Sequence, residues 1–367
     1  MYARVRNLSF FVLISALPTV LVLTGPNVAW AQNGAWSATS DLGAIQGQNT
    51  ATKLQDGRIL VVGNDRFGQM AAEIYDPASA TWTRQANPIR QRYGFTATLL
   101  PDGRVLIVGG DAFGYNTSEA FDPSNGSWTV TANLNGPRVN GRVAALVDGR
   151  VLIAGGARPP SVDPLQDAEI YDPASDTWTV TGSMVVGLPW FTMTTLQDGT
   201  VLAAGGGYNN ITSEVYDPIA GTWSQGGDLA GANQGFALTV LADGRAFAVG
   251  GTGTHHLYDP VSRTWRVTAA PGVTASYTTS TLLQNGTVLL AGSDYCCSAS
   301  SAVFDPSSET WQLTGNMVQR PRQHHSAVLL NNGTVLAVGG YYEGPPCDEG
   351  SCTVYYLKSA EIFTPQR

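Results

Sequence analysis

The hydrophobic pattern of this chain is that of short β-strands, and it recurs seven times. In each copy a partly alternating segment, such as 93–100, is followed by Asp-Gly or Asn-Gly and then by an almost wholly apolar run, such as 105–108. Partial alternation indicates a strand with one covered face, whereas a short continuous apolar run indicates a strand covered on both faces. Asp-Gly and Asn-Gly suit a tight two-residue turn. Each copy is therefore predicted to begin with a β-hairpin.

The second half of each copy predicts two further strands. Paired glycines end most of the apolar runs, among them Gly109-Gly110 and Gly155-Gly156, and they indicate close backbone approach. A segment resembling Glu-Ile-Tyr-Asp-Pro follows, and Asp-Pro favours a turn. The last strand carries a tryptophan, and these tryptophans are separated by 46, 46, 50, 45, 42 and 46 residues: Trp36, Trp82, Trp128, Trp178, Trp223, Trp265 and Trp311.

The order of the copies predicts a closed ring. Four short strands per copy with no helical pattern between them favour a β-propeller, in which neighbouring blades cover each other's apolar faces. Trp36 precedes the first complete copy, while the last copy ends at Phe363 without a tryptophan. The predicted fold is all-β: a seven-bladed β-propeller of four-stranded blades, with the N-terminal strand completing the last blade. A linear solenoid is the alternative, but it needs polar end caps that neither terminus supplies.

Paired glycines, a later tyrosine and a later tryptophan, in this order and spacing, resemble the kelch repeat. The resemblance covers residues 34–365. It departs from the pattern at Gly63-Asn64, at Gly292-Ser293 and in three copies that carry phenylalanine instead of tyrosine. The Gly-His and Trp-Asp signatures of WD40 repeats are absent. Membership of the galactose oxidase/kelch propeller superfamily implies a fold, but it implies little about function, because many chemistries share such rings.

The N-terminal segment resembles a secretory signal peptide. Arg4 and Arg6 precede an apolar run from Leu8 to Leu23, and Ala29-Trp30-Ala31 offers a small-x-small cleavage pattern. An uncleaved membrane anchor is the alternative, although the apolar run is short for a span and contains a proline. We therefore expect a signal peptide over 1–31 and a single propeller domain over 32–367. The mature protein is expected to be secreted, periplasmic or on the cell surface, with no membrane span.

The composition of the chain argues against one class of partner. The net charge is −8 and only 13% of residues are charged, so a nucleic-acid partner is not expected.

The four cysteines are expected to form disulfides, because cysteines of an exported chain are expected to be oxidised. Cys347 and Cys352 are predicted to pair with each other, while Cys296 and Cys297 form a vicinal disulfide or bridge to that pair; the sequence does not choose. No cofactor is expected, and the protein is expected to be a monomer.

The connections that vary between copies locate the expected binding face. The Asp-Gly turns and the Asp-Pro turns are nearly constant, whereas the other two connections vary and gather on the opposite side of a propeller. Variable loops on a rigid scaffold are the usual seat of binding. These loops supply the following candidates: Asp111, Tyr115, Arg158, Tyr208, Tyr295, Tyr341 and Glu343.

Three arginines occupy one aligned position, eleven residues before the turn glycine. Arg92, Arg138 and Arg322 share it, with Arg142 and Arg320 close by. The planar fork of arginine suits a carboxylate or sulfate ligand, so these residues are binding candidates. The structural alternative is that they bond backbone carbonyls of the next blade, as in the kelch consensus. Convergence with an acid such as Asp111 or Glu343 would favour an enzyme.

Histidines and cysteines invite metal hypotheses that the sequence does not favour. His255-His256 and His324-His325 belong to copies five and seven, and the kelch consensus itself has a histidine where His325 falls. A galactose-oxidase-like copper enzyme needs a Tyr-His pair, which this chain lacks. A sialate mutarotase of kelch type is usually six-bladed. We therefore expect a non-catalytic propeller that binds a protein or glycan, the alternative being a small-molecule enzyme at the channel mouth.

Overall fold

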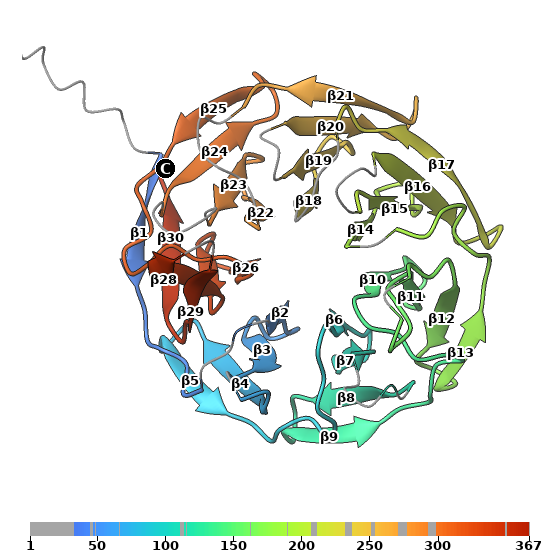
Figure 1. Cartoon of the computed structure of the whole chain (residues 1–367). Helices are drawn as coiled ribbons and strands as arrows, with labels where there is room; N and C mark the ends of the chain where they lie inside the picture. The colour runs from blue at the N-terminus through green and yellow to red at the C-terminus, as the bar shows by residue number, and fades with distance from the viewer. Residues whose placement is uncertain are drawn as a thin grey trace, which may run out of the picture. The chain divides into compact units, whose positions relative to one another are not determined.

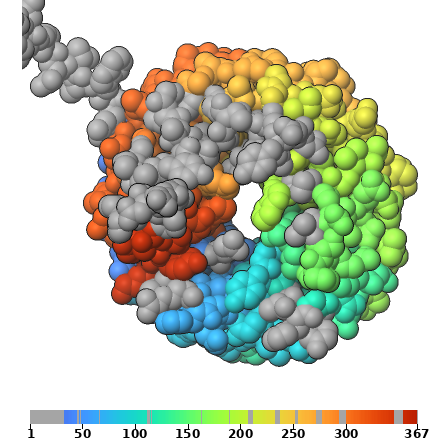
Figure 2. All heavy atoms as spheres, viewed as in Figure 1, coloured from blue at the N-terminus to red at the C-terminus, as the bar shows by residue number. Residues whose placement is uncertain are grey.

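Seven four-stranded antiparallel sheets surround a central channel (Figures 1 and 2). The computed structural model describes residues 33–366, except 45–46, 48, 66, 111–113, 115, 162, 189, 207–210, 232–236, 251–253, 271–276, 293–298 and 349–350; for 345–348 and 351–352 it describes the backbone alone. Every regular element in the described part is a β-strand. The predicted all-β propeller with seven blades is confirmed.

Within each blade the strands are named A to D from the channel outward, in the order of the chain. Blades one to three comprise β2 (Asn49–Lys53), β3 (Ile59–Asn64), β4 (Met70–Asp76), β5 (Thr81–Arg84); β6 (Thr96–Leu99), β7 (Val105–Val108), β8 (Ser118–Asp122), β9 (Ser127–Val130); and β10 (Arg142–Ala145), β11 (Val151–Ala154), β12 (Ala168–Asp172), β13 (Thr177–Val180).

Blades four to six repeat the same plan. They comprise β14 (Thr192–Thr195), β15 (Val201–Ala204), β16 (Thr212–Asp217), β17 (Thr222–Asp228); β18 (Ala237–Val240), β19 (Ala246–Val249), β20 (His255–Asp259), β21 (Thr264–Thr268); and β22 (Thr279–Leu282), β23 (Val288–Ala291), β24 (Ser301–Asp305), β25 (Thr310–Leu313).

The seventh blade is built from both ends of the described chain. Its A, B and C strands are β26 (Ser326–Leu329), β27 (Val335–Val338) and β30 (Ala360–Pro365), and its D strand is β1 (Gly34–Ala38). The register places Trp36 opposite Phe363. A separate hairpin, β28 (Tyr341–Asp348) with β29 (Ser351–Tyr356), forms the B–C connection of this blade. The N-terminal strand therefore closes the ring, as its tryptophan indicated.

Each blade packs on its neighbours through an apolar cluster of its own. Consecutive A strands contact one another around the whole ring, including β26 with β2. Seven buried clusters correspond to the seven blade interfaces, and each draws residues from two adjacent blades. The B strands are buried on both faces, which explains their continuous apolar sequence.

The repeated tryptophans belong to these interfaces. Each lies beside the aromatic residue of its own C strand, for example Trp178 with its ring centroid 5.0 Å from that of Tyr171. The Trp178 indole also donates a hydrogen bond of 3.2 Å to the Ser118 hydroxyl in the preceding blade. A regular spacing of about one blade therefore places one aromatic pair at each interface.

The N-terminal predictions fall outside this description. Residues 1–31, the expected signal peptide, are not among the described residues, so cleavage and export stay predictions. Within the described residues there is no helix of the length and apolarity that a bilayer span requires.

Candidate functional site

The two faces of the ring differ in the connections that they carry. The A–B and C–D turns lie on one side, here called the turn face, and the B–C and D–A connections lie on the other, here called the loop face. The A–B turns are uniform because Asp or Asn accepts an N–H bond from the residue two positions later, as Asp102 does from Arg104 at 3.0 Å. The loop face holds the variable residues.

Among the described residues, five equivalent ones mark the loop-face mouth of the channel, each two positions before an A strand. We call them the mouth ring: Gly94, Asn140, Trp190, Tyr277 and His324. All five have positive φ, from 50° to 62°. Two adjacent pairs of mouth-ring residues are joined through the backbone: the Asn140 N–H donates to the Gly94 carbonyl at 2.7 Å, and the His324 N–H donates to the Tyr277 carbonyl at 3.4 Å. Positive φ is uncommon for bulky residues, and such backbone strain clusters at functional sites.

Aromatic side chains gather at this mouth. The His324 ring stacks on Tyr277 with centroids 4.3 Å apart and on Tyr341 with centroids 5.2 Å apart. Trp190, in blade four, is 61% exposed, whereas the next residue, Phe191, is buried. The Phe191 side chain packs in the apolar cluster between blades three and four, and this packing fixes the backbone next to the exposed Trp190 indole.

The β28–β29 hairpin extends the aromatic surface outward from the mouth (dark red over blade seven in Figure 1). Tyr341 contacts Tyr356 edge-on, with centroids 6.1 Å apart. Tyr342 stacks on Tyr355 at 4.9 Å, and the Arg320 guanidinium lies 5.4 Å from the Tyr342 ring centre. We call the mouth ring and these hairpin tyrosines together the aromatic mouth.

The three aligned arginines are not on this surface. Arg92 is fully buried and pairs with the Glu119 carboxylate at 2.7 Å. Its guanidinium also donates to the carbonyls of Gly109 and Thr117, at 2.7 and 3.0 Å. All these partners belong to the arginine's own blade and not to the next one.

The other two arginines repeat the arrangement. Arg138 pairs with Glu169 and Arg322 with Glu361, both at 2.7 Å and both buried. The pairs lie in blades two, three and seven, so their guanidinium groups do not share a pocket. Each glutamate also accepts N–H bonds from the connection that enters the blade; Glu361 accepts one from Val318. The pair therefore fastens that connection to strand C, which is a structural role.

Blade four keeps the glutamate without the arginine. Leu188 occupies the arginine position and is buried, while Glu214 accepts N–H bonds from Val185 and Val186 at 2.7 and 2.8 Å. Burial raises the pKa of the Glu214 carboxyl above its usual value, and the two backbone donors act in the opposite direction.

The paired glycines do lie where backbones approach closely. A Cβ on Gly109 would stand 2.7 Å from the Arg138 carbonyl oxygen of the next blade. A Cβ on Gly110 would stand 2.6 Å from the Tyr93 carbonyl oxygen. Gly156 likewise faces the backbone of Val139 and Gly141, whereas Gly155 faces the Phe191 ring, and all four glycines have positive φ. Side chains at these positions would separate the blades at the mouth.

The histidine pairs occupy different environments. His255 and His256 are buried in β20, and burial lowers the pKa of His255 to about 4. His325 is bonded to the Thr279 hydroxyl at 3.0 Å, and burial lowers its pKa to about 3. Burial, together with the charge of Arg142, lowers the pKa of His324 to about 4. Across the described residues, no three His, Cys, Asp or Glu side chains gather as a metal site would require.

The remaining sequence candidates separate into three groups. Tyr341 belongs to the aromatic mouth, and Glu343 is half-buried on β28. Arg158 is half-exposed and pairs with Asp167 at 3.0 Å. The other candidates lie outside the described residues: Asp111, Tyr115, Tyr208 and Tyr295.

The predicted disulfides also remain untested. Cys347 and Cys352 are opposite one another in the backbone register of β28 and β29. Their pairing stays a prediction because the structure describes only the backbone there. Cys296 and Cys297 lie outside the described residues.

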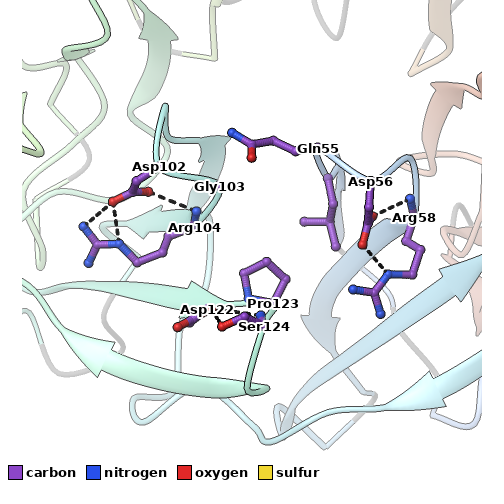
Figure 3. A pocket seen from close by; sticks show the side chains of 10 residues that line it. Gln55, Asp56, Arg58, Asp102, Gly103, Arg104, Asp122, Pro123 and Ser124 are labelled. Atoms are coloured by element: carbon purple, nitrogen blue, oxygen red, sulfur yellow. Dashed lines mark hydrogen bonds and ion pairs between the residues drawn. The ribbon is translucent and has the colours of Figure 1, made fainter.

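Pockets on the turn face are a product of blade geometry. A pocket of about 450 Å³ opens between blades one and two, lined by two Asp-Gly-Arg turns and the Asp122-Pro123-Ser124 turn (Figure 3). A similar pocket of about 280 Å³ lies between blades seven and one. Asp56 pairs with Arg58 and Asp102 with Arg104, so both arginines of the first pocket are already engaged by carboxylates. The aromatic mouth is therefore the stronger candidate site.

Comparisons with known proteins agree with the fold. Residues 138–185, which span blade three, match the Kelch motif family. The chain is therefore a seven-bladed β-propeller that carries a Kelch motif in its third blade. Among solved structures, it is similar to a fungal alcohol oxidase of the AA5 family in complex with copper. The two share 17% identity with a TM-score of 0.71, over 91% of this chain and 76% of that one. At this identity the likeness concerns the fold. The search of curated proteins found no match.

Proposed function

We propose that this kelch propeller is an exported, non-catalytic binding protein that takes a glycan at the aromatic mouth of its loop face. The observation that carries the proposal is the exposed indole of Trp190 beside the channel, on a backbone with φ of 59°. A bulky residue held at positive φ carries backbone strain, and such strained residues cluster at ligand-binding sites.

The chemistry of the surface suits carbohydrate. A sugar ring presents C–H groups on its faces, and these pack on aromatic rings through dispersion, while its hydroxyls seek polar partners. Tyr277, His324 and Tyr341 offer ring faces and polar atoms together. The A strands below are rich in threonine and serine, as in β14 and β22. Both kinds of contact are thus available at one mouth.

The alternative is a small-molecule enzyme at the same mouth. The support for this alternative is the similarity to the copper alcohol oxidase. At 17% identity, that similarity is evidence for a shared fold and not for a shared activity. The described residues do not supply a set of ligands for copper. A sialate-mutarotase-like enzyme would instead use arginines at the mouth, but Arg92, Arg138 and Arg322 are buried and paired with glutamates of their own blades. The binding function is therefore preferred.

A glycan array with the purified protein, followed by calorimetry on the best ligand, tests the proposal. Trp190→Asn is the informative variant, because Asn140 occupies the same position in blade three with φ of 58°. The backbone is thereby retained while the indole is removed. We expect at least about a tenfold loss of affinity, as for a central aromatic contact. Ile219→Ala, which removes a 97% exposed apolar side chain from the turn face, is the control and should leave affinity unchanged. Unchanged binding by Trp190→Asn, or no glycan bound by the wild type, would refute the proposal.

A further inference from the structure

The innermost strands carry charge of the opposite sign to the protein as a whole. The net charge of the chain is −8. The seven A strands nevertheless contain no aspartate or glutamate, and their charged residues are Lys53 in β2 and Arg142 in β10. The charges that the A strands themselves bring to the channel are thus positive, and a fixed cation attracts an anion. The channel wall therefore favours an anion.

The Arg142 guanidinium has more N–H donors than the two hydrogen bonds described for it use. Its Nε donates to the Phe191 carbonyl at 2.9 Å, and one terminal nitrogen lies 3.4 Å from the Gly141 carbonyl. No carboxylate of the described residues pairs with it, in contrast to the buried arginines of blades two, three and seven. Burial lowers the pKa of its guanidinium and no acid opposes that shift. A guanidinium has five N–H donors, so most of those on Arg142 remain available.

Arg142 is placed at the aromatic mouth. It begins β10 two residues after Asn140 of the mouth ring, and its Phe191 partner is next in sequence to Trp190. Its charge also acts on His324, in blade seven, which is not adjacent to blade three. The influence therefore crosses the channel. A ligand seated between these blades would meet the cation and the aromatic rings together.

We propose that the channel mouth recognises an acidic saccharide, whose carboxylate pairs with Arg142 while its sugar rings pack on Trp190 and on the Tyr277–His324–Tyr341 stack. This inference rests on the proposed function and names its substrate class. The terminal nitrogens of arginine form a planar fork that matches the two oxygens of a carboxylate. A uronic acid residue brings that carboxylate on a pyranose ring.

Calorimetry with matched oligosaccharides tests the inference. Oligogalacturonate and neutral galacto-oligosaccharides of equal length are titrated into the wild type and into Arg142→Gln, Arg142→Lys and Arg150→Gln. Arg150 is the control, because it lies on the turn face and pairs with Asp148 at 2.7 Å. A sulfated galacto-oligosaccharide forms a further arm that separates carboxylate from sulfate. Thermal unfolding of each variant checks that the fold is kept.

We expect the wild type to bind the uronate about tenfold to hundredfold more tightly than the neutral oligomer, as a charge-assisted hydrogen bond implies. Arg142→Gln should abolish this preference, so that the ratio of the two affinities, measured in the same variant, falls to about one. Arg142→Lys should keep part of it, and Arg150→Gln should keep all of it. Equal affinity for both oligomers, a preference for the sulfated oligomer, or a preference that survives in Arg142→Gln would overturn this inference alone. Absence of binding to every oligomer would overturn the proposed function as well.

Discussion

Replacing Arg92 with leucine should cost the protein roughly 3–5 kcal/mol of unfolding free energy. The guanidinium is fully buried and donates to the Glu119 carboxylate, to two backbone carbonyls and to the Thr117 hydroxyl. Removing it leaves a buried carboxylate without its cation and takes one donor away from each of two backbone carbonyls. Breaking a buried ion pair from one side typically costs about 3–5 kcal/mol. That corresponds to a factor of about 10²–10⁴ in the folding equilibrium constant.

The matched control is Arg104→Leu on the turn face. Arg104 pairs with Asp102 at the same distance of 2.7 Å, but both side chains are partly exposed. Surface pairs of this kind contribute about 0–1 kcal/mol. The double variant Arg92→Leu/Glu119→Gln should be less destabilised than the sum of its two single changes, because the second change removes the stranded charge.

Equilibrium unfolding in guanidinium chloride measures five proteins, with the slope m checked for constancy: the wild type, Arg104→Leu, Arg92→Leu, Glu119→Gln and the double variant. The expected order of stability is wild type, Arg104→Leu, the double variant and Arg92→Leu. If Arg92→Leu and Arg104→Leu lose the same free energy, or if the double variant is strictly additive, the buried pairs do not fasten the blades as described.

Two further changes test other parts of the structure. Trp178→Ala should destabilise the protein by about 3–5 kcal/mol, because it leaves a cavity at a blade interface. Trp190→Asn, which removes an exposed side chain, should change the stability little. A near-zero effect of Trp178→Ala in thermal unfolding would contradict the interface role. Burial raises the pKa of Glu214, so the folded state favours its protonated form, and this contribution to stability is lost as pH rises from about 4.5 through the folded pKa. Denaturation at several pH values should show wild-type stability falling relative to Glu214→Gln over that range, and a difference independent of pH would refute the assignment.

The fold was predictable because its signals are repeated and local. Asp-Gly turns, apolar B strands and evenly spaced tryptophans each report on one blade, and seven copies remove accidental matches. Closure followed from one misplaced residue, Trp36, whose partner Phe363 lacks a tryptophan of its own. These features depend on the spacing of residue types along the chain, which can be counted in the sequence itself.

The role of the arginines was harder to predict, because whether an arginine side chain is buried or exposed depends on a partner in another strand. Arg92, Arg138 and Arg322 all occur in blades whose C strand carries Glu two residues before its aromatic residue. That coincidence within the chain was the available signal for a buried pair. Blades one and four, which keep the glutamate without the arginine, obscure it.

The mouth ring was missed for a different reason. Trp190, Tyr277 and His324 share one offset, nine residues before the turn glycine. Their side chains differ in every blade, so no residue type repeats, and what they share is a positive φ. A positive φ can be predicted from the sequence when glycine occupies the position, as Gly94 does. It is hard to predict when another residue type occupies it.

The pairing of β1 with β30 makes the order of synthesis matter. Ala35 and Thr364 are register partners across almost the whole length of the polypeptide. A ribosome must therefore release nearly all of the chain before the last blade can obtain its outer strand. Joining such distant segments carries the largest loop-closure entropy in the molecule and slows folding. Until then the seventh sheet offers an unpaired edge to any neighbouring polypeptide, and a chaperone that shields this edge would protect the protein at its most vulnerable stage.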